Sequence, residues 1–448
     1  MGVRYRSHGP LLAGLVLLGA TAVLPQSMAS AARGPALRQL HFRSERQKIG
    51  NMFGLGTYIA KRYPKAFKPA VRRVARTGAT WVREEFTASN LHSGPKVPYD
   101  FVSYDRVVDA ELRHRLHILG LLDYNNSWHG HDHVWMGHAH IKSLVHDYVG
   151  FVKAVVAHYA HRIHEWQVWN EPDLSLFWKP FPNAVDYAYL LRETYRAIKS
   201  VNPHTKVVMA GPSGADRFAL RYIHRVAAAG GRFDQVAMQP YTTWPGQSLL
   251  NQIGQLRQFH KPIWFTEIGW AGQARCLPCG SPQAEASKLA TTYALTAVAG
   301  VAKVFWYDFR DDGLRQNYTD HFGLVEYNFA GKPTYLAYQT GAFFLDRALV
   351  AGVDRLSRSL TVYKLQKQRR IYYLAWNSDR SRWQTVILRW SGSSERVLSN
   401  TGQQVTRSGR GRLRLSVPPG SIRYVAALQV RPPARAPHGI KVPPGHTR

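Results

Sequence analysis

The amino-acid sequence predicts an α/β fold, a (β/α)₈ TIM barrel followed by a small antiparallel β-sandwich. The chain has 448 residues, which suits a barrel of about 250–300 residues together with an accessory domain. Short β-rich runs alternate with amphipathic helical runs from residue 50 to residue 349, as expected of a parallel sheet. From residue 350 to residue 430 short alternating strands replace this pattern.

Eight segments of the first region have the length and apolar content of buried parallel strands. In chain order they are Phe53–Tyr58, Thr80–Phe86, Leu116–Asp123, Glu165–Asn170, Lys206–Gly211, Asp234–Gln239, Ile263–Glu267 and Lys303–Asp308. Helical patterns separate them. In one pattern Val185, Ala188, Leu191, Tyr195 and Ile198 share a face at three- and four-residue spacing. Eight β-α pairs without an internal gap are the number that closes a barrel.

Two helix-start signals precede the second region. Ser281-Pro282 places an N-cap serine before a proline at the first helical position, and Gly331-Lys332-Pro333 opens a last helix that we expect to end near Leu349. Five short alternating runs follow, a pattern typical of an antiparallel sandwich. They are Thr361–Leu365, Ile371–Trp376, Trp383–Trp390, Arg412–Val417 and Ile422–Leu428. Residues 431–448 are rich in proline, glycine and basic residues, and we expect this tail to be disordered.

Residues 1–31 have the features of an export signal. Arginines precede the apolar run Leu11–Leu24, and Ala29–Ala31 supplies small residues for cleavage. The apolar run is short for a membrane span, although retention as an uncleaved anchor is an alternative. We therefore expect a secreted or cell-envelope-associated protein, in which residues 32–49 form a basic and poorly ordered lead-in.

The formal net charge is +31 and the sequence pI is near 10.3. Such a field attracts polyanions, whether acidic polysaccharide, an anionic envelope surface or nucleic acid; a solvated basic surface without a specific partner is the alternative. The sequence has neither zinc-finger spacing nor an RNA-binding signature, so nucleic acid is not an expected partner. The two cysteines, Cys276 and Cys279, are too few for a four-ligand zinc site. In an exported chain we expect them to form a local disulfide.

Two glutamates end the predicted strands 4 and 7 of the barrel. Glu171 lies in Trp-Gln-Val-Trp-Asn-Glu-Pro, and Glu267 lies in Ile-Trp-Phe-Thr-Glu-Ile-Gly-Trp. Functional residues of such barrels gather at the C-terminal ends of the strands, and apolar flanks can raise the pKa of a carboxyl group. Glycosidic hydrolysis requires such a pair. One carboxylic acid protonates the leaving oxygen, and the other carboxylate attacks the anomeric carbon or activates water.

These two motifs on these two strands resemble glycoside hydrolase clan A, the 4/7 superfamily, over the whole barrel. The appended sandwich and the layout are similar to those of families 39 and 5. The resemblance implies that Glu171 is the acid/base, that Glu267 is the nucleophile and that Asn170 bonds the sugar 2-hydroxyl. This chain has Gln239 where family 39 members often carry the histidine of His-x-Tyr, so the choice between families stays open.

Three further residues match positions of the clan. Arg83 matches the arginine that holds the nucleophile ionised, Tyr241 the tyrosine that hydrogen-bonds the nucleophile, and Trp306 the platform tryptophan under the sugar. A cation beside a carboxylate favours its charged form. The alternatives are that Arg83 pairs with Glu84 or Glu85, and that the two aromatic residues only pack in the barrel.

The loop after strand 3, residues 123–140, is rich in histidine and tryptophan. A metal site is one interpretation, but the residues lack a fixed ligand spacing, and we expect no metal ion. We expect instead that Trp128 and Trp135 stack on sugars and that protonated histidines meet acidic groups. Exposed side chains without either role are the alternative. Trp270, which follows strand 7, is a further expected sugar contact.

Together these features predict a retaining glycoside hydrolase that cleaves β-glycosidic bonds in an oligo- or polysaccharide, with no metal or organic cofactor. The charge suggests an anionic or envelope-associated substrate. A non-catalytic glycan-binding protein on a hydrolase fold is a rival that the two glutamates disfavour, and a transglycosylase with the same residues is another. We expect the sandwich to buttress the barrel rather than to bind glycan. The sugar, the linkage, endo or exo action and the oligomeric state stay open.

Overall fold

The computed structural model describes the chain from residue 37 to residue 440 with short gaps. The described ranges are 37–94, 96–125, 134, 136–214, 217–241, 244–272, 280–314, 317–390, 395–409, 411–433 and 436–440. The expected export signal, Trp128, Trp135, Cys276 and Cys279 lie outside these ranges. Within them, no helix combines the length and the apolar content that crossing a membrane requires.

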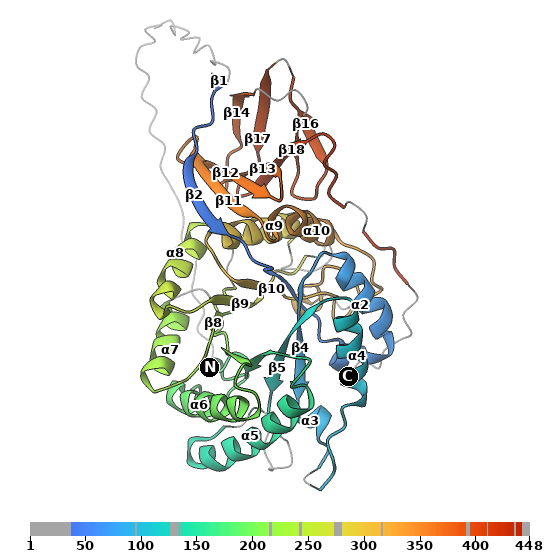
Figure 1. Ribbon diagram of the computed structural model, residues 1–448, viewed down its shortest axis with the longest axis vertical. Coiled ribbons are helices and arrows are strands. Elements are labelled where there is room, and N and C mark those ends of the chain that lie inside the picture. Colours follow the sequence, from blue (N-terminus) through green and yellow to red (C-terminus); the bar gives the residue numbers. More distant parts are fainter. Residues whose placement is uncertain are drawn as a thin grey trace, which may run out of the picture. The chain divides into compact units, whose positions relative to one another are not determined.

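The eight predicted barrel strands are all present and parallel (Figure 1). They are β3 (Phe53–Gly56), β4 (Trp81–Thr87), β5 (His117–Asp123), β6 (Glu165–Val168), β7 (Lys206–Met209), β8 (Val236–Met238), β9 (Ile263–Ile268) and β10 (Lys303–Trp306). Hydrogen bonds order them β7-β6-β5-β4-β3-β10-β9-β8. A parallel bridge between Val208 and Gln235 joins β7 to the segment that leads into β8. The sheet therefore closes on itself, which confirms the predicted barrel.

Helices follow the strands and cover the outside of the barrel (Figure 1). The longer ones are α2 (Phe67–Arg76), α4 (Val102–Arg113), α5 (Ile141–His158), α6 (Ala184–Val201), α7 (Arg217–Ala228), α8 (Gln247–Leu256), α9 (Pro282–Val298) and α10 (Pro333–Leu345). Single turns complete the loops: α1 (Ile59–Arg62), η1 (Pro64–Ala66), α3 (Ala88–Leu91), η3 (His138–His140), η4 (Arg257–Phe259) and η5 (Tyr318–Asp320).

Local sequence signals explain how two of these helices begin. The Ser281 hydroxyl accepts a hydrogen bond from the amide of Ala284 at 3.2 Å, and Pro282 occupies the first helical position of α9, as predicted. On α6, Ala188, Leu191 and Ile198 are buried as expected, whereas the side chain of Val185 is 60% exposed. Val185 stands on the first turn of α6, ahead of the part that packs on the barrel.

The last helix is shorter than predicted. α10 ends at Leu345, and Leu349 begins a strand instead of ending the helix. Asp346 leaves the helix and accepts a hydrogen bond from the amide of Met52 at 3.1 Å. Arg347 has a φ of 57°, a left-handed conformation that does not continue an α-helix.

The predicted sandwich is confirmed, with more strands than the sequence suggested. One sheet has the order β16-β15-β18-β13-β12-β11-β2 and the other the order β1-β14-β17. The strands are β1 (Leu37–Arg38), β2 (Arg43–Lys48), β11 (Leu349–Arg355), β12 (Leu360–Lys367), β13 (Arg370–Asn377), β14 (Gln384–Arg389), β15 (Glu395–Leu398), β16 (Gln404–Arg407), β17 (Arg412–Val417) and β18 (Ile422–Ala427). Buried aliphatic side chains from both sheets, among them Val362, Leu388 and Leu415, form a separate core.

Both ends of the described chain are more ordered than predicted. The expected lead-in contributes β2, whose residues pair antiparallel with β11 and cover an edge of the larger sheet. In the expected disordered tail, the amide of Ile440 donates to the carbonyl of Asn328, and the amide of Gly331 donates to the carbonyl of Pro437, both at 2.8 Å. These contacts are made by backbone groups, which composition does not reveal.

The barrel and the sandwich belong to one compact unit that begins at Leu37. The Trp244 indole donates to the carbonyl of Gly420 at 3.2 Å. The Asn400 amide donates to the Ser287 hydroxyl of α9 at 2.9 Å. Such contacts agree with a sandwich that supports the barrel, while the division into two domains stays a prediction.

Candidate active site

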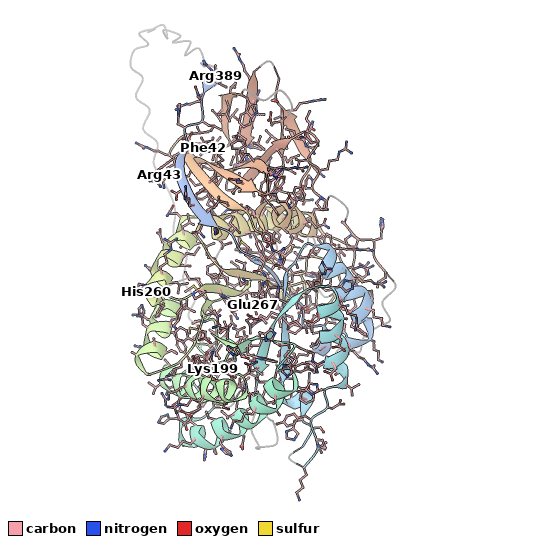
Figure 2. All side chains as sticks on the ribbon, viewed as in Figure 1. Phe42, Arg43, Lys199, His260, Glu267 and Arg389 are labelled. Atoms are coloured by element: carbon pink, nitrogen blue, oxygen red, sulfur yellow. The ribbon has the colours of Figure 1, made fainter. Side chains whose placement is uncertain are left out.

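Glu267 lies at the centre of the barrel and forms the core of the candidate site (Figure 2). It is the last residue but one of β9, and its side chain is 14% exposed. The Tyr241 hydroxyl donates to Oε1 at 2.7 Å. The other oxygen, Oε2, accepts from Nη1 of Arg83 at 2.9 Å and from the Tyr58 hydroxyl at 3.3 Å. Both oxygens of Glu267 therefore have a fixed orientation.

Arg83 connects Glu267 to the other side of the barrel mouth. Its side chain is 1% exposed. Besides Glu267, it donates to the Tyr58 hydroxyl at 2.6 Å, to Oε1 of Gln167 at 2.8 Å and to Oδ1 of Asn170 at 2.9 Å. Burial alone would lower the pKa of Arg83, but the acidic groups of Tyr58 and Glu267 outweigh it and raise this pKa. The guanidinium is thus a permanent cation. It connects β4 with Gln167 of β6 and Glu267 of β9 through hydrogen bonds.

The alternative partners of Arg83 are engaged elsewhere. Glu84 accepts from the Thr57 hydroxyl at 2.5 Å and from the amide of Ile59 at 3.0 Å. Glu85 accepts from Nζ of Lys61 at 2.6 Å. Successive side chains of a strand point to opposite faces, which explains why Glu84 faces away from Arg83. The expected contact between Arg83 and Glu267 is present, and the alternative ion pairs are not formed.

Asn170 is oriented by two donors. Its Oδ1 accepts from Arg83 and also from Nε2 of Gln239 at 2.8 Å. Because Oδ1 faces these donors, the amide nitrogen of Asn170 points the other way. Gln239, which is fully buried, thereby supplies a neutral donor at the position where the sequence departs from the family 39 pattern.

Glu171 stands beside this network in a different environment. Its side chain is buried, with 7% of the residue exposed. Burial and the negative charge of Glu267 raise the pKa of Glu171 to about 8, although a hydrogen bond from Ser213 opposes the rise. The backbone is strained here, because Trp169 and Glu171 have φ values of 69° and 40°. The site thus holds one carboxyl with a raised pKa beside another carboxyl that binds a guanidinium.

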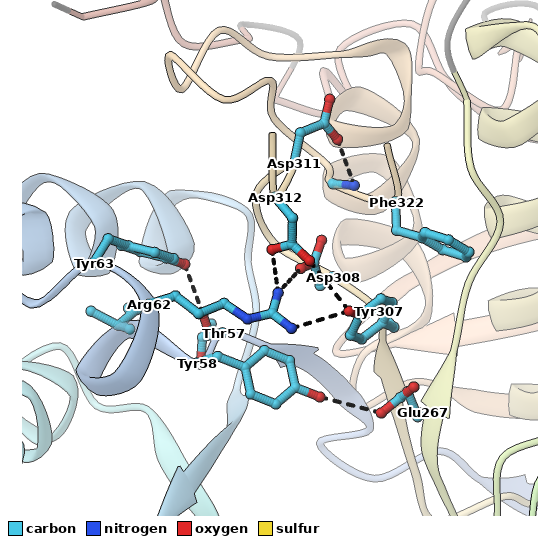
Figure 3. Close-up of polar contacts among 12 residues, drawn as sticks. Thr57, Tyr58, Arg62, Tyr63, Glu267, Tyr307, Asp308, Asp311, Asp312 and Phe322 are labelled. Atoms are coloured by element: carbon cyan, nitrogen blue, oxygen red, sulfur yellow. Dashed lines mark hydrogen bonds and ion pairs between the residues drawn. The ribbon is translucent and has the colours of Figure 1, made fainter. Parts of the chain in front are cut away.

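The helical turn after β3 contributes a second polar network that sequence reasoning missed. The Arg62 guanidinium lies 4.5 Å from the centre of the Tyr58 ring and donates to Asp308 at 2.9 Å, to Tyr307 at 3.1 Å and to Asp312 (Figure 3). Tyr58 connects this network to Glu267. Tyr58 ends the first predicted strand, and this position could have identified it as a site residue, because the C-terminal ends of barrel strands line the mouth.

Asp123 adds a further carboxyl to the wall formed by β4 and β5. It is 1% exposed, and burial together with the charge of Glu85 raises its pKa well above the usual range, against the opposing charges of Arg83 and Lys61. Within the described ranges, no three histidine, cysteine, aspartate or glutamate side chains are arranged to hold a metal ion.

The chain is similar to known glycoside hydrolases. A model of glycosyl hydrolase family 53 matches residues 128–301. A β-xylosidase from Geobacillus stearothermophilus is 30% identical over 161 residues, which cover 32% of this chain and 31% of that enzyme. The chain thus matches about a third of the length of this relative.

Solved structures share the fold. A family 39 glycoside hydrolase from Bacteroides cellulosilyticus WH2 has a TM-score of 0.69 at 20% identity, over 85% of this chain and 81% of that one. A family 39 β-xylosidase from Caulobacter crescentus has a TM-score of 0.61 at 16% identity, over 86% and 98% of the two chains. The resemblance to clan A is confirmed.

Trp306 and Trp270, two of the expected sugar contacts, are both buried, and their contact with sugar stays a prediction. Trp306 is fully buried and donates from its indole to the carbonyl of Phe322 at 3.3 Å. Trp270 is 6% exposed, and its ring lies 5.7 Å from that of Trp306. The next residue, Tyr307, is partly exposed and stands edge-on to Tyr58 at 5.9 Å. Tyr307 is therefore more accessible at the end of β10 than Trp306.

Proposed function

We propose that this protein is a retaining glycoside hydrolase that cleaves β-glycosidic bonds of an oligo- or polysaccharide by double displacement. One observation carries the proposal. Glu267 accepts three hydrogen bonds, one from a buried guanidinium, while burial beside Glu267 raises the pKa of Glu171 to about 8. The reaction requires one carboxylic acid that gives up a proton and one carboxylate that attacks the anomeric carbon.

In the first step Glu267 attacks the anomeric carbon, the bond from that carbon to the leaving oxygen breaks, and Glu171 gives its proton to the leaving oxygen. In the second step Glu171, now a carboxylate, takes a proton from water. The water oxygen attacks the same carbon, and the ester bond to Glu267 breaks.

The electrostatics support this exchange of roles. The charge of Glu267 is one of the causes that raise the pKa of Glu171. Formation of the glycosyl ester removes that charge, so the pKa of Glu171 falls once the intermediate exists. Glu171 is then suited to act as a base in the second step, and Asn170, held by Arg83 and Gln239, orients its amide toward the bound sugar.

The test begins with aryl β-glycosides, β-xylosides first because β-xylosidases are among the relatives. Wild type is compared with Glu171→Gln, Glu267→Gln and the control Glu165→Gln, which changes a glutamate at the opposite end of β6. We expect both site variants to lose nearly all steady-state turnover (kcat) and the control to keep it. Activity that survives in Glu267→Gln contradicts the assigned nucleophile.

Azide rescue distinguishes the two roles. A small anion in place of the lost carboxylate should give a β-glycosyl azide from Glu171→Ala and an α-glycosyl azide from Glu267→Ala, because azide then attacks either the intermediate or the substrate. The same azide configuration from both variants is incompatible with double displacement. Product chains longer than the substrate identify a transglycosylase instead.

A further inference from the structure

Exposed apolar side chains lie on the loop that follows Glu171 and at the start of α7. The loop that follows this residue carries Leu174, Leu176 and Phe181, and α7 begins with Phe218 in its first turn. Leu176 is 68% exposed, Phe181 77% and Phe218 60%. We call these four residues the apolar rim. A single exposed leucine needs no explanation, whereas several large apolar side chains in one region indicate an interaction surface.

Hydrogen bonds hold the two parts of the rim together. The Asp173 carboxylate accepts from the amide of Ser213, at 3.1 and 3.0 Å to its two oxygens. The Tyr222 hydroxyl of α7 donates to the carbonyl of Pro172 at 3.0 Å. Between them lies a cavity of about 380 Å³, lined by residues of both segments that include Pro182 and Phe218. The loop after Glu171 and the first turns of α7 therefore lie together at the barrel mouth.

Arginines flank the same surface. The guanidinium groups of Arg217 and Arg221 lie 5.3 and 4.6 Å from the centre of the Phe218 ring, and Arg225 follows one turn later on α7. All three side chains are exposed, and none forms an ion pair with a carboxylate in the part of the chain that the structure describes. The surface is thus both apolar and positively charged, in a protein with a formal net charge of +31.

We propose that the apolar rim, with Arg217 and Arg221, docks on the surface of an anionic lipid membrane. Apolar side chains that enter the interface beside cations that meet anionic head groups are the two contributions by which proteins bind such surfaces. Other occupants fit less well. Sugar stacking uses flat aromatic faces. The leucines have no such face, and the guanidinium groups of Arg217 and Arg221 already lie against the ring of Phe218. A soluble polyanion uses the arginines but leaves the leucines exposed.

The position of the rim indicates which side of the cleft would face the membrane, an inference that rests on the proposed function. Glu171 protonates the leaving group, so the leaving-group side of the cleft is the side that carries the rim. A membrane bound there would lie next to the part of the glycan released by the first step. The inference thus selects glycans attached to a lipid surface through their leaving-group end.

Co-sedimentation with vesicles tests the docking without any need for hydrolysis. The full chain is mixed with vesicles of phosphatidylcholine alone, or with equal parts of phosphatidylglycerol. Wild type should sediment with the anionic vesicles, and added salt should weaken binding. The affinity of the variant Leu176→Ser/Phe181→Ser/Phe218→Ser for these vesicles should be lower by about tenfold or more. A matched variant, Val102→Ser/Ile371→Ser/Trp383→Ser, removes three exposed apolar side chains elsewhere and should bind as wild type.

The arginines are tested in the same assay. Arg217→Gln/Arg221→Gln should weaken binding more than Arg72→Gln/Arg76→Gln, which removes two exposed arginines from α2. Wild type that ignores anionic vesicles overturns the proposal, as does a rim variant that binds like its control. Full competition by soluble polygalacturonate, with no effect of the serine substitutions, assigns the surface to a polyanion instead. Hydrolysis of a soluble aryl glycoside by the rim variant reports separately on the proposed function.

Discussion

Nη1 of Arg83 lies 2.9 Å from Oε2 of Glu267, and the same guanidinium orients Asn170 and Gln167. Arg83→Lys keeps the positive charge but cannot reach three acceptors with a rigid planar fork. We expect kcat/KM to fall by about 100-fold or more, whereas Arg72→Lys on the exposed face of α2 has no effect. Kinetics with an aryl glycoside check this, and near-normal activity of Arg83→Lys would show that charge alone suffices.

The two tyrosines on Glu267 are not equivalent. Tyr241 donates at 2.7 Å to Oε1, and Tyr58 donates at 3.3 Å to Oε2, which Arg83 also contacts. A hydrogen bond to a charged group contributes about 1.5–3 kcal/mol, so Tyr241→Phe should lower kcat by about 10–100-fold. Tyr58→Phe should have the smaller effect, because Arg83 continues to hold Oε2. The reverse order in measured kcat values contradicts this account.

The pKa of Glu171 predicts an alkaline limit to activity. Glu171 must be protonated to act as the acid, and its pKa is raised to about 8, so kcat/KM should decline as pH rises above that value. With Glu171→Gln the decline should disappear for aryl glycosides whose leaving group departs without protonation. A pH-rate profile of both proteins checks the prediction, and an unchanged alkaline limb in the variant assigns it to another group.

Gln239 provides a test of how the site departs from the family 39 pattern. Its amide donates to Oδ1 of Asn170 at 2.8 Å. Gln239→His can keep a donor at this place, whereas Gln239→Leu leaves Asn170 with Arg83 alone. We expect Gln239→Leu to lose about tenfold in kcat/KM and Gln239→His to lose less. Equal losses would mean that packing, rather than the hydrogen bond, decides this position.

The barrel was predictable because its strands are buried on both faces and so appear as continuous apolar runs between helical patterns. β2 was not predictable, because its sequence Arg-Ser-Glu-Arg-Gln-Lys has no apolar residue. Its place is set by backbone pairing with β11. Polar edge strands of this kind carry no periodic signal.

The positions of Glu267, Asn170 and Tyr241 were predictable because each lies at or just after the end of a strand that the motifs mark. Arg83 lies within β4, and its motif placed it on that strand. The burial of Trp306 has a local reason: the pairing of β9 and β10 shifts register between Val304 and Trp306, and such an irregularity changes which side chains face the mouth. Arg62 was missed because Tyr58 turns the chain with a φ of 49°, a conformation that sequence periodicity does not reveal.

Glu171 also predicts a pH-dependent stability that is separable from activity. Its pKa is about 8 in the folded protein against 4.5 for a solvated glutamate, so the folded state holds the proton that the unfolded state releases. The resulting stability is complete below about pH 4.5 and is lost as pH rises toward about 8, at about 1.4 kcal/mol per pKa unit. Glu171→Gln has no such loss. Relative to wild type, its Tm should therefore rise on going from about pH 4 to about pH 8, and the exposed control Glu326→Gln should show no such trend. A Tm difference that is the same at both pH values would mean that Glu171 is ionised in the folded site, and would remove it as the proton donor.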